Sequence, residues 1–83
     1  MDNRAIVIFN NIQKNIKVDI EIPLDITAND LIIGLNKAYT LGIDTNNLAQ
    51  CYLSCENPIY LLRGNITLRE CGIRNGTTIN FVR

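Results

Sequence analysis

Three cysteines, Cys51, Cys55 and Cys71, are the side chains of this 83-residue sequence with the most varied chemistry. A thiol can attack an electrophile, pair in a disulfide or bind a metal ion. However, a disulfide framework favours an even number of cysteines, and this spacing fits no common zinc or iron–sulfur pattern. We therefore expect no metal and no cofactor, and we interpret the three thiols as small apolar side chains in a reducing environment.

The sequence contains no histidine, which is the residue that most often acts as a general acid or base in catalysis. Asp19 and Glu21 stand two positions apart, which on a strand places both carboxylates on one solvent-facing side. There they would keep a sheet soluble rather than act as a catalytic pair. The glycines are isolated and form no phosphate-binding run. We expect no catalytic residue, and therefore a protein that is not an enzyme.

Charge and hydropathy narrow the range of partners. Eight Lys and Arg residues balance eight Asp and Glu residues, so the chain lacks the basic surplus typical of nucleic-acid binding. No apolar run approaches the ~20 residues that span a bilayer, and the N-terminus does not resemble a signal peptide. We expect a cytoplasmic protein of one domain, residues 1–83, without nucleic-acid binding or direct membrane insertion.

Apolar periodicity predicts two strands at the start of the chain. Residues 16–22 (IKVDIEI) alternate between apolar and charged side chains, which indicates one face on a core and one in water. Residues 4–9 (RAIVIF) are β-branched and aromatic, but both faces are apolar. We expect the row formed by Ala5, Val7 and Phe9 to point inward.

A helix is predicted next. Thr27 is a good N-cap residue, and Asp30 favours the positive end of the helix dipole. Four apolar residues then recur at helical spacing, with Ile32 and Tyr39 flanking them: Leu31, Leu35, Ala38 and Leu41. Gly42 is the expected stop, because glycine readily adopts the left-handed cap conformation.

The second half of the sequence begins with a predicted polar linker over residues 43–47. Three more strands are then predicted, at residues 49–55, 59–62 and 78–82. Between the last two strands, residues 67–71 are long enough only for a helical turn, with Leu68 and Ile73 anchored inward. The predicted class is α+β, with a mixed sheet of four to five strands crossed by one main helix.

This order of elements is that of the β-grasp fold, and residues 67–79 (TLRECGIRNGTTI) resemble the ubiquitin-like signature in this region. The stretch Leu68-Arg69-Glu70-Cys71-Gly72-Ile73-Arg74-Asn75-Gly76 is similar to the Leu-x-x-Cys-Gly-Ile-x-Asn-Gly version found in one family. These are the small ubiquitin-like YukD/EsaB proteins of Gram-positive type VII secretion systems.

The resemblance implies a non-conjugating accessory or regulatory protein that binds a component or regulator of the secretion machinery. Ubiquitin-type modifiers and sulfur carriers need a flexible C-terminal Gly-Gly, whereas this sequence ends on Phe81-Val82-Arg83. Two alternatives stay open: a covalent modifier or sulfur carrier with a longer native C-terminus, and a ubiquitin-like domain of a larger scaffold protein.

In ubiquitin-like folds the sheet face away from the helix, together with the first hairpin loop, commonly binds partners. The predicted strand registers place Ile12, Tyr52, Asn80 and Val82 on that face, which is bordered by the charged side of residues 16–22. An aromatic residue with a charged rim is typical of protein interfaces, although scattered apolar residues also occur on ordinary surfaces. A homodimer through this face or through an open edge strand is a further expectation.

Overall fold

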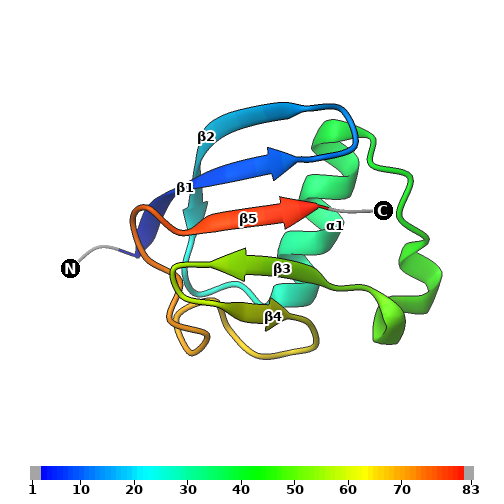
Figure 1. Ribbon diagram of the computed structural model, residues 1–83. Helices are drawn as coiled ribbons and strands as arrows, with labels where there is room; N and C mark the ends of the chain where they lie inside the picture. Colours follow the sequence, from blue (N-terminus) through cyan, green and yellow to red (C-terminus); the bar gives the residue numbers. More distant parts are fainter. Residues whose placement is uncertain (1–2, 82–83) are drawn as a thin grey trace.

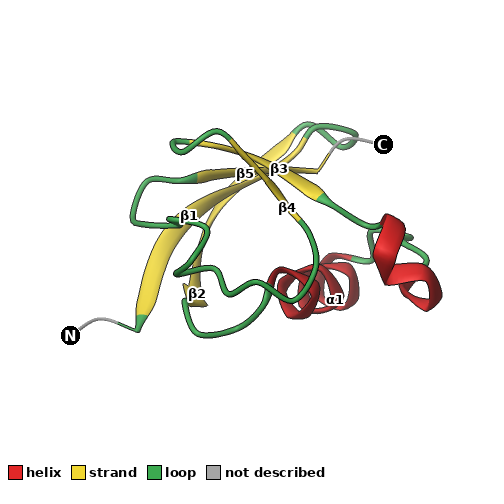
Figure 2. Cartoon of the chain, turned by 90° about the horizontal axis from the view of Figure 1, so that it is seen from below, coloured by secondary structure: helices red, strands yellow, loops and turns green. Residues whose placement is uncertain are grey.

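A mixed five-stranded sheet packs against one main helix (Figures 1 and 2). The computed structural model describes residues 3–81. The elements in chain order are β1 (Arg4–Asn11), β2 (Ile16–Pro23), α1 (Ala28–Tyr39), η1 (Thr45–Gln50), β3 (Leu53–Glu56), β4 (Tyr60–Leu62) and β5 (Thr78–Phe81). The spatial order is β2-β1-β5-β3-β4, and β5 lies parallel to β1 whereas the other neighbours are antiparallel. The predicted α+β, β-grasp class is confirmed.

The first hairpin has the faces that its sequence predicts. Ala5, Val7 and Phe9 are at most 3% exposed, so the inward row of β1 is confirmed. They pair with Ile22, Ile20 and Val18 of β2, whose apolar row therefore extends the same face. Because β2 is an edge strand, most of that row stays half-buried rather than buried.

Helix α1 begins where the sequence predicts but ends earlier. The Thr27 hydroxyl accepts from the Asp30 N–H at 3.1 Å, and the Asp30 carboxylate accepts from the Thr27 N–H at 3.2 Å, which completes a capping box. The helix stops because Thr40 itself takes the left-handed cap, two residues before Gly42. Within the predicted apolar repeat, Ala38 departs from the pattern because it is exposed, whereas the flanking Tyr39 is half-buried and packs against the core.

The segment after the helix also differs from the prediction. A linker over 43–47 and a strand from residue 49 were expected, but residues 45–50 form η1 and β3 begins at Leu53. The Asp44 carboxylate accepts from the Asn46 N–H at 3.1 Å and starts this 3-10 turn. Local side-chain capping therefore replaces the expected strand pairing at residues 49–52.

The connection between β4 and β5 is tied to the segment before the helix. Leu68 and Ile73 are 0% and 4% exposed, which confirms both as inward anchors. The Leu68 N–H donates to the Ile26 carbonyl at 2.9 Å, and the Arg69 N–H donates to the Leu24 carbonyl at 3.0 Å. These two bonds hold residues 68–69 against residues 24–26, beside the core. Within residues 3–81, no helix has the length and apolar character needed to cross a membrane.

Candidate functional site

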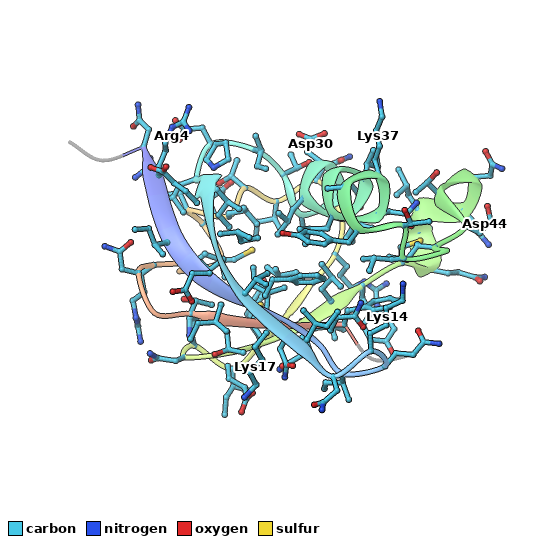
Figure 3. All side chains as sticks on the ribbon, turned by 90° about the horizontal axis from the view of Figure 1, so that it is seen from above. Arg4, Lys14, Lys17, Asp30, Lys37 and Asp44 are labelled. Carbon is cyan, nitrogen blue, oxygen red and sulfur yellow. The ribbon has the colours of Figure 1, made fainter. Side chains whose placement is uncertain are left out.

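The candidate site lies on the outer face of the sheet, which we define as the face turned away from α1. Figure 2 shows α1 and η1 together on the opposite side of the sheet. Asp30 and Lys37 project from the helix side of the molecule, as Figure 3 shows. Residues that are paired across neighbouring strands lie on the same face of the sheet. One such row of outer-face residues crosses all five strands: Lys17, Asn10, Asn80, Ser54 and Leu61.

Polar side chains occupy the centre of this outer face. The Asn10 side-chain amide donates to Asn80 Oδ1 at 2.9 Å, and Asn80 Nδ2 donates to Glu56 Oε2 at 3.1 Å. Asn80 is only 8% exposed, because these two neighbours cover it. The sequence places Asn80 on this face, where it lies, but its amide is held in a ladder across three strands. It can therefore hold its neighbours in place rather than offer a large contact surface.

Ile12 and Tyr52 lie at one end of the sheet, on either side of the end of β5. Ile12 follows β1, and its N–H donates to the Phe81 carbonyl at 3.1 Å. Tyr52 precedes β3, which runs antiparallel to β5 and so starts at the same end. Both are exposed, at 49% and 58%. The fourth predicted residue, Val82, lies outside the described residues.

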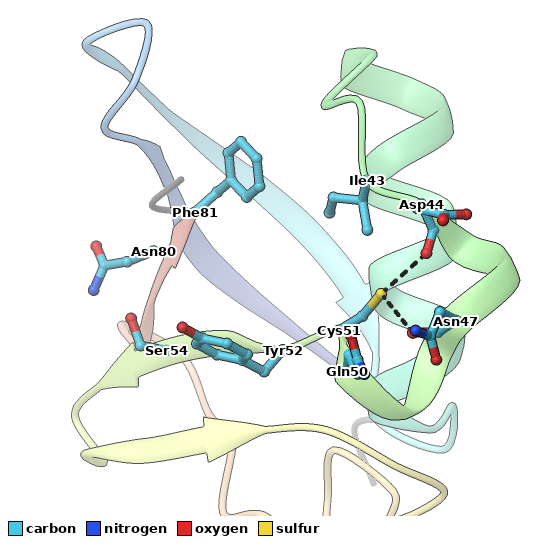
Figure 4. Close-up of a pocket in the computed structure, with 9 residues that line it drawn as sticks. All are labelled: Ile43, Asp44, Asn47, Gln50, Cys51, Tyr52, Ser54, Asn80 and Phe81. Atoms are coloured by element: carbon cyan, nitrogen blue, oxygen red, sulfur yellow. Dashed lines mark hydrogen bonds between the residues drawn. The ribbon is translucent and has the colours of Figure 1, made fainter.

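A pocket of about 760 Å³ opens beside Tyr52 (Figure 4). Three segments form it: the turn that carries η1, the start of β3 and the end of β5. Tyr52, Ser54 and Asn80 line it together with the apolar Ile43 and Phe81. We use the name candidate interface for Ile12, Tyr52, Ser54 and Asn80 with this pocket.

The three thiols have different surroundings. Burial, together with a smaller contribution from the neighbouring Cys71, raises the pKa of Cys55 from 9.0 to about 12. Burial also raises the pKa of Cys71, while a hydrogen bond with Tyr60 opposes that rise and the Glu70 charge adds to it. The half-buried Cys51 thiol donates to the Asp44 and Asn47 carbonyls at 3.4 and 3.5 Å (Figure 4). Raised pKa values keep Cys55 and Cys71 protonated and poorly nucleophilic at neutral pH.

Alkylation at pH 8 should distinguish these thiols. We expect iodoacetamide to modify Cys51 first in the native chain, because roughly one Cys55 in ten thousand is ionised at that pH and its side chain is buried. In denaturant all three thiols should react. Intact-mass measurement with peptide mapping gives the order of labelling. Equal rates at Cys51 and Cys55 in the native chain would contradict the burial of Cys55.

The sequence did not single out the apolar surface at the far side of the sheet. Ile59 is 90% exposed, Leu61 is 42% exposed and Tyr60 is 39% exposed. An unbroken apolar run such as residues 59–62 is typical of a buried strand, and only the topology shows that β4 is an edge. The described residues contain no group of three His, Cys, Asp or Glu side chains that could hold a metal ion.

Comparison with known proteins gives one family and one fold. The sequence model of the family described as "WXG100 protein secretion system (Wss), protein YukD" matches residues 7–80. A search of the curated proteins found no match.

Solved structures agree in fold at low sequence identity. The C-terminal ubiquitin-like domain of mouse tubulin-specific chaperone e matches at a TM-score of 0.70 and 13% identity, over 94% of this chain and 84% of that one. A de novo design based on ubiquitin matches at 0.67 and 16%, over 96% and 88%. The ubiquitin-like domain of Plasmodium falciparum Dsk2 matches at 0.60 and 18%, over 93% and 96%. These similarities establish the ubiquitin-like fold.

Proposed function

The chain belongs to the YukD family of the WXG100, or type VII, protein secretion system, and from this we propose that it is a non-conjugating accessory or regulatory protein of that system. It binds a component or regulator of the machinery non-covalently. Residues 1–83 act as a single ubiquitin-like domain in the cytoplasm of a Gram-positive bacterium, and the protein is not an enzyme.

The observation that carries this proposal is the candidate interface at the end of the sheet where β5 ends and β3 begins. Tyr52 is 58% exposed beside a pocket whose lining includes the buried Phe81. An exposed aromatic side chain can insert into a partner, and the pocket beside it, which includes the apolar Ile43 and Phe81, can receive a partner side chain. Asn80 supports this arrangement, because its hydrogen bonds to Asn10 and Glu56 tie together the strands beneath it.

The surroundings of Tyr52 also favour a protein partner over a charged polymer. The pocket walls carry amides and hydroxyls with a single carboxylate, at Asp44. On the same sheet face, three strands away on β2, Lys17 stands with Asp19 and Glu21, so positive charge is balanced there. A polar surrounding without an excess of positive charge is typical of protein–protein interfaces.

A complementation experiment tests this function. In a host that lacks its own copy, we expect the wild-type chain to restore secretion of a WXG100 substrate and Tyr52→Asp to fail. A charged carboxylate in an aromatic hot spot should weaken binding by about 2 kcal/mol or more, roughly thirtyfold. The measurement is the amount of substrate in the culture medium at matched levels of the accessory protein.

Ile33→Asp is the matched control, because Ile33 is also an exposed apolar residue, at 41%, but lies on the helix side of the molecule. It should restore secretion as the wild type does. Equal activity of both variants would exclude Tyr52 from the interface. Failure of the wild-type chain to restore secretion would contradict the proposed function itself.

A further inference from the structure

The sheet has one edge that remains open for pairing. Strand β4 is the last strand of the order β2-β1-β5-β3-β4 and forms the lower border of the sheet in Figure 1. Within residues 3–81, no hydrogen bond joins the backbone of residues 59–62 to any segment except β3. The N–H and C=O groups that point away from β3 are therefore available to another strand.

The two edges of the sheet differ in how they are protected. Strand β2 carries Lys17, Asp19 and Glu21 on its outer face and ends on Pro23, which has no N–H to donate. Charges and proline are the usual means by which an edge strand avoids pairing. Within its own bounds, Tyr60–Leu62, strand β4 has neither: Leu61 is 42% exposed on its outer face, and Ile59 in the turn just before it is 90% exposed. This apolar edge is the one suited to strand addition.

We propose that the β4 edge pairs antiparallel with the β4 edge of a second copy of this chain, which joins the two sheets into one sheet of ten strands. The two-fold axis passes through the middle of β4, at Leu61. Leu61 then lies opposite Leu61 of the second copy, and Tyr60 lies opposite Leu62 of the second copy. Residues directly opposite in an antiparallel pair share a face, so the exposed outer-face leucines cover each other.

Charge complementarity favours a second copy as the occupant of this edge. Continued by one residue beyond each end of β4, the same register places Arg63 opposite Ile59 of the second copy. The β3–β4 register, continued by one residue past Tyr60 into the turn, brings Glu56 beside Ile59. Arg63 thus stands two strands, about 10 Å, from Glu56 of the second copy on the same face. Long side chains span that distance over Ile59. The two-fold axis repeats the pair, which gives two Arg63–Glu56 contacts.

Both charged groups are available for this contact. Arg63 is exposed and makes no hydrogen bond or ion pair with any other described residue. Glu56 uses Oε2 to accept from Asn80, which holds its side chain on the outer face and leaves Oε1 for a second donor. A three-residue edge buries a small area, so we expect a transient dimer at the low end of interface sizes.

This dimer is independent of the secretion role. A chain that stays monomeric could still bind the machinery through Tyr52, and a chain that dimerises could fail to do so. The test therefore uses the purified chain alone, and its failure leaves the secretion experiment unaffected.

Sedimentation equilibrium at chain concentrations up to about 1 mM tests the dimer with two charge-reversal variants. We expect the wild type to dimerise, and Arg63→Glu and Glu56→Arg each to weaken the dimer about tenfold or more, because each homodimer then contains two like-charge contacts. In an equimolar mixture, each Arg63–Glu56 position holds opposite charges again, so a heterodimer should form at near wild-type strength.

The mixture separates loss of pairing from loss of folding, because two misfolded chains would not restore a dimer. Three results would overturn the inference: a wild type that stays monomeric, variants that dimerise as well as the wild type, or a mixture that stays monomeric.

A second pair of variants locates the interface at β4. Leu61→Lys places like charges at the two-fold axis and should abolish the dimer. Ile16→Lys at the β2 edge is the control, since Ile16 is 46% exposed and Leu61 is 42% exposed. If Ile16→Lys were the disruptive change, the β2 edge would be the interface and the assignment to β4 would be wrong.

Discussion

Replacing Phe9 with alanine is expected to lower the free energy of unfolding by about 3–5 kcal/mol. Phe9 lies in the middle of β1, is 1% exposed and stacks at a tilt on Tyr39, with ring centroids 5.0 Å apart. Truncation removes this contact between sheet and helix and leaves a cavity between them. A domain of this size has a total stability of about 5–15 kcal/mol, so the loss is a large part of it. Urea denaturation followed by circular dichroism measures the change.

Ile12→Ala is the matched control for Phe9→Ala, because it truncates a large apolar side chain that is 49% exposed. In the purified chain it should alter stability by less than about 1 kcal/mol. Similar losses for the two variants would contradict the assignment of Phe9 to the central core.

Thr77→Val is expected to cost about 2–5 kcal/mol although the two side chains have nearly the same shape. Thr77 is 0% exposed. Its hydroxyl donates to the Asn57 carbonyl at 2.7 Å and accepts from the Arg74 N–H at 3.1 Å. Valine leaves both backbone groups without a partner, and each such loss costs about 1–3 kcal/mol when the group is buried. Chemical denaturation again gives the difference.

Thr77→Ser separates the hydroxyl from the methyl group of Thr77. Serine keeps both hydrogen bonds and loses one methyl, which is expected to cost about 1 kcal/mol. If valine were tolerated better than serine, the tie between the two turns would not stabilise the fold.

Local patterns were sufficient to predict the elements whose sequence and tertiary environment agree. The alternation in residues 16–22 matches a strand with one covered face, and Thr27 with Asp30 forms the cap that its chemistry favours. Both features depend on neighbours in the sequence, which is why sequence alone finds them.

Features that depend on distant neighbours could not be predicted in this way. The expected strand over 49–52 is replaced by η1 because Asp44 caps a turn there. Asn80 is covered because Asn10 and Glu56, both far away in sequence, converge on it. Leu61 is exposed on β4, the last strand of the sheet, and strand order is not encoded in the apolar pattern of a single strand. Ile59 is exposed in the turn before β4, although the apolar run predicted it to be part of the strand.

The same distinction applies to the positions of the residues in the candidate interface. Tyr52 alternates with the less exposed Cys51 and Leu53, as the sequence pattern predicts, although β3 starts at Leu53 and not at residue 49. The pocket beside it depends on η1 packing near the end of β5, so no pattern in either segment alone predicts it.

Non-covalent binding to the secretion machinery is the central claim, and capture of the tagged full-length chain from its native host tests it most directly. The tagged wild type and its Tyr52→Asp and Ile33→Asp variants are purified, washed either in native buffer or in strong denaturant, and analysed by quantitative mass spectrometry. We expect secretion-system proteins to be recovered with the wild type and Ile33→Asp in native buffer, depleted with Tyr52→Asp, and absent after denaturant. A covalent adduct that survives denaturant, or native capture without any secretion-system protein, would contradict the claim.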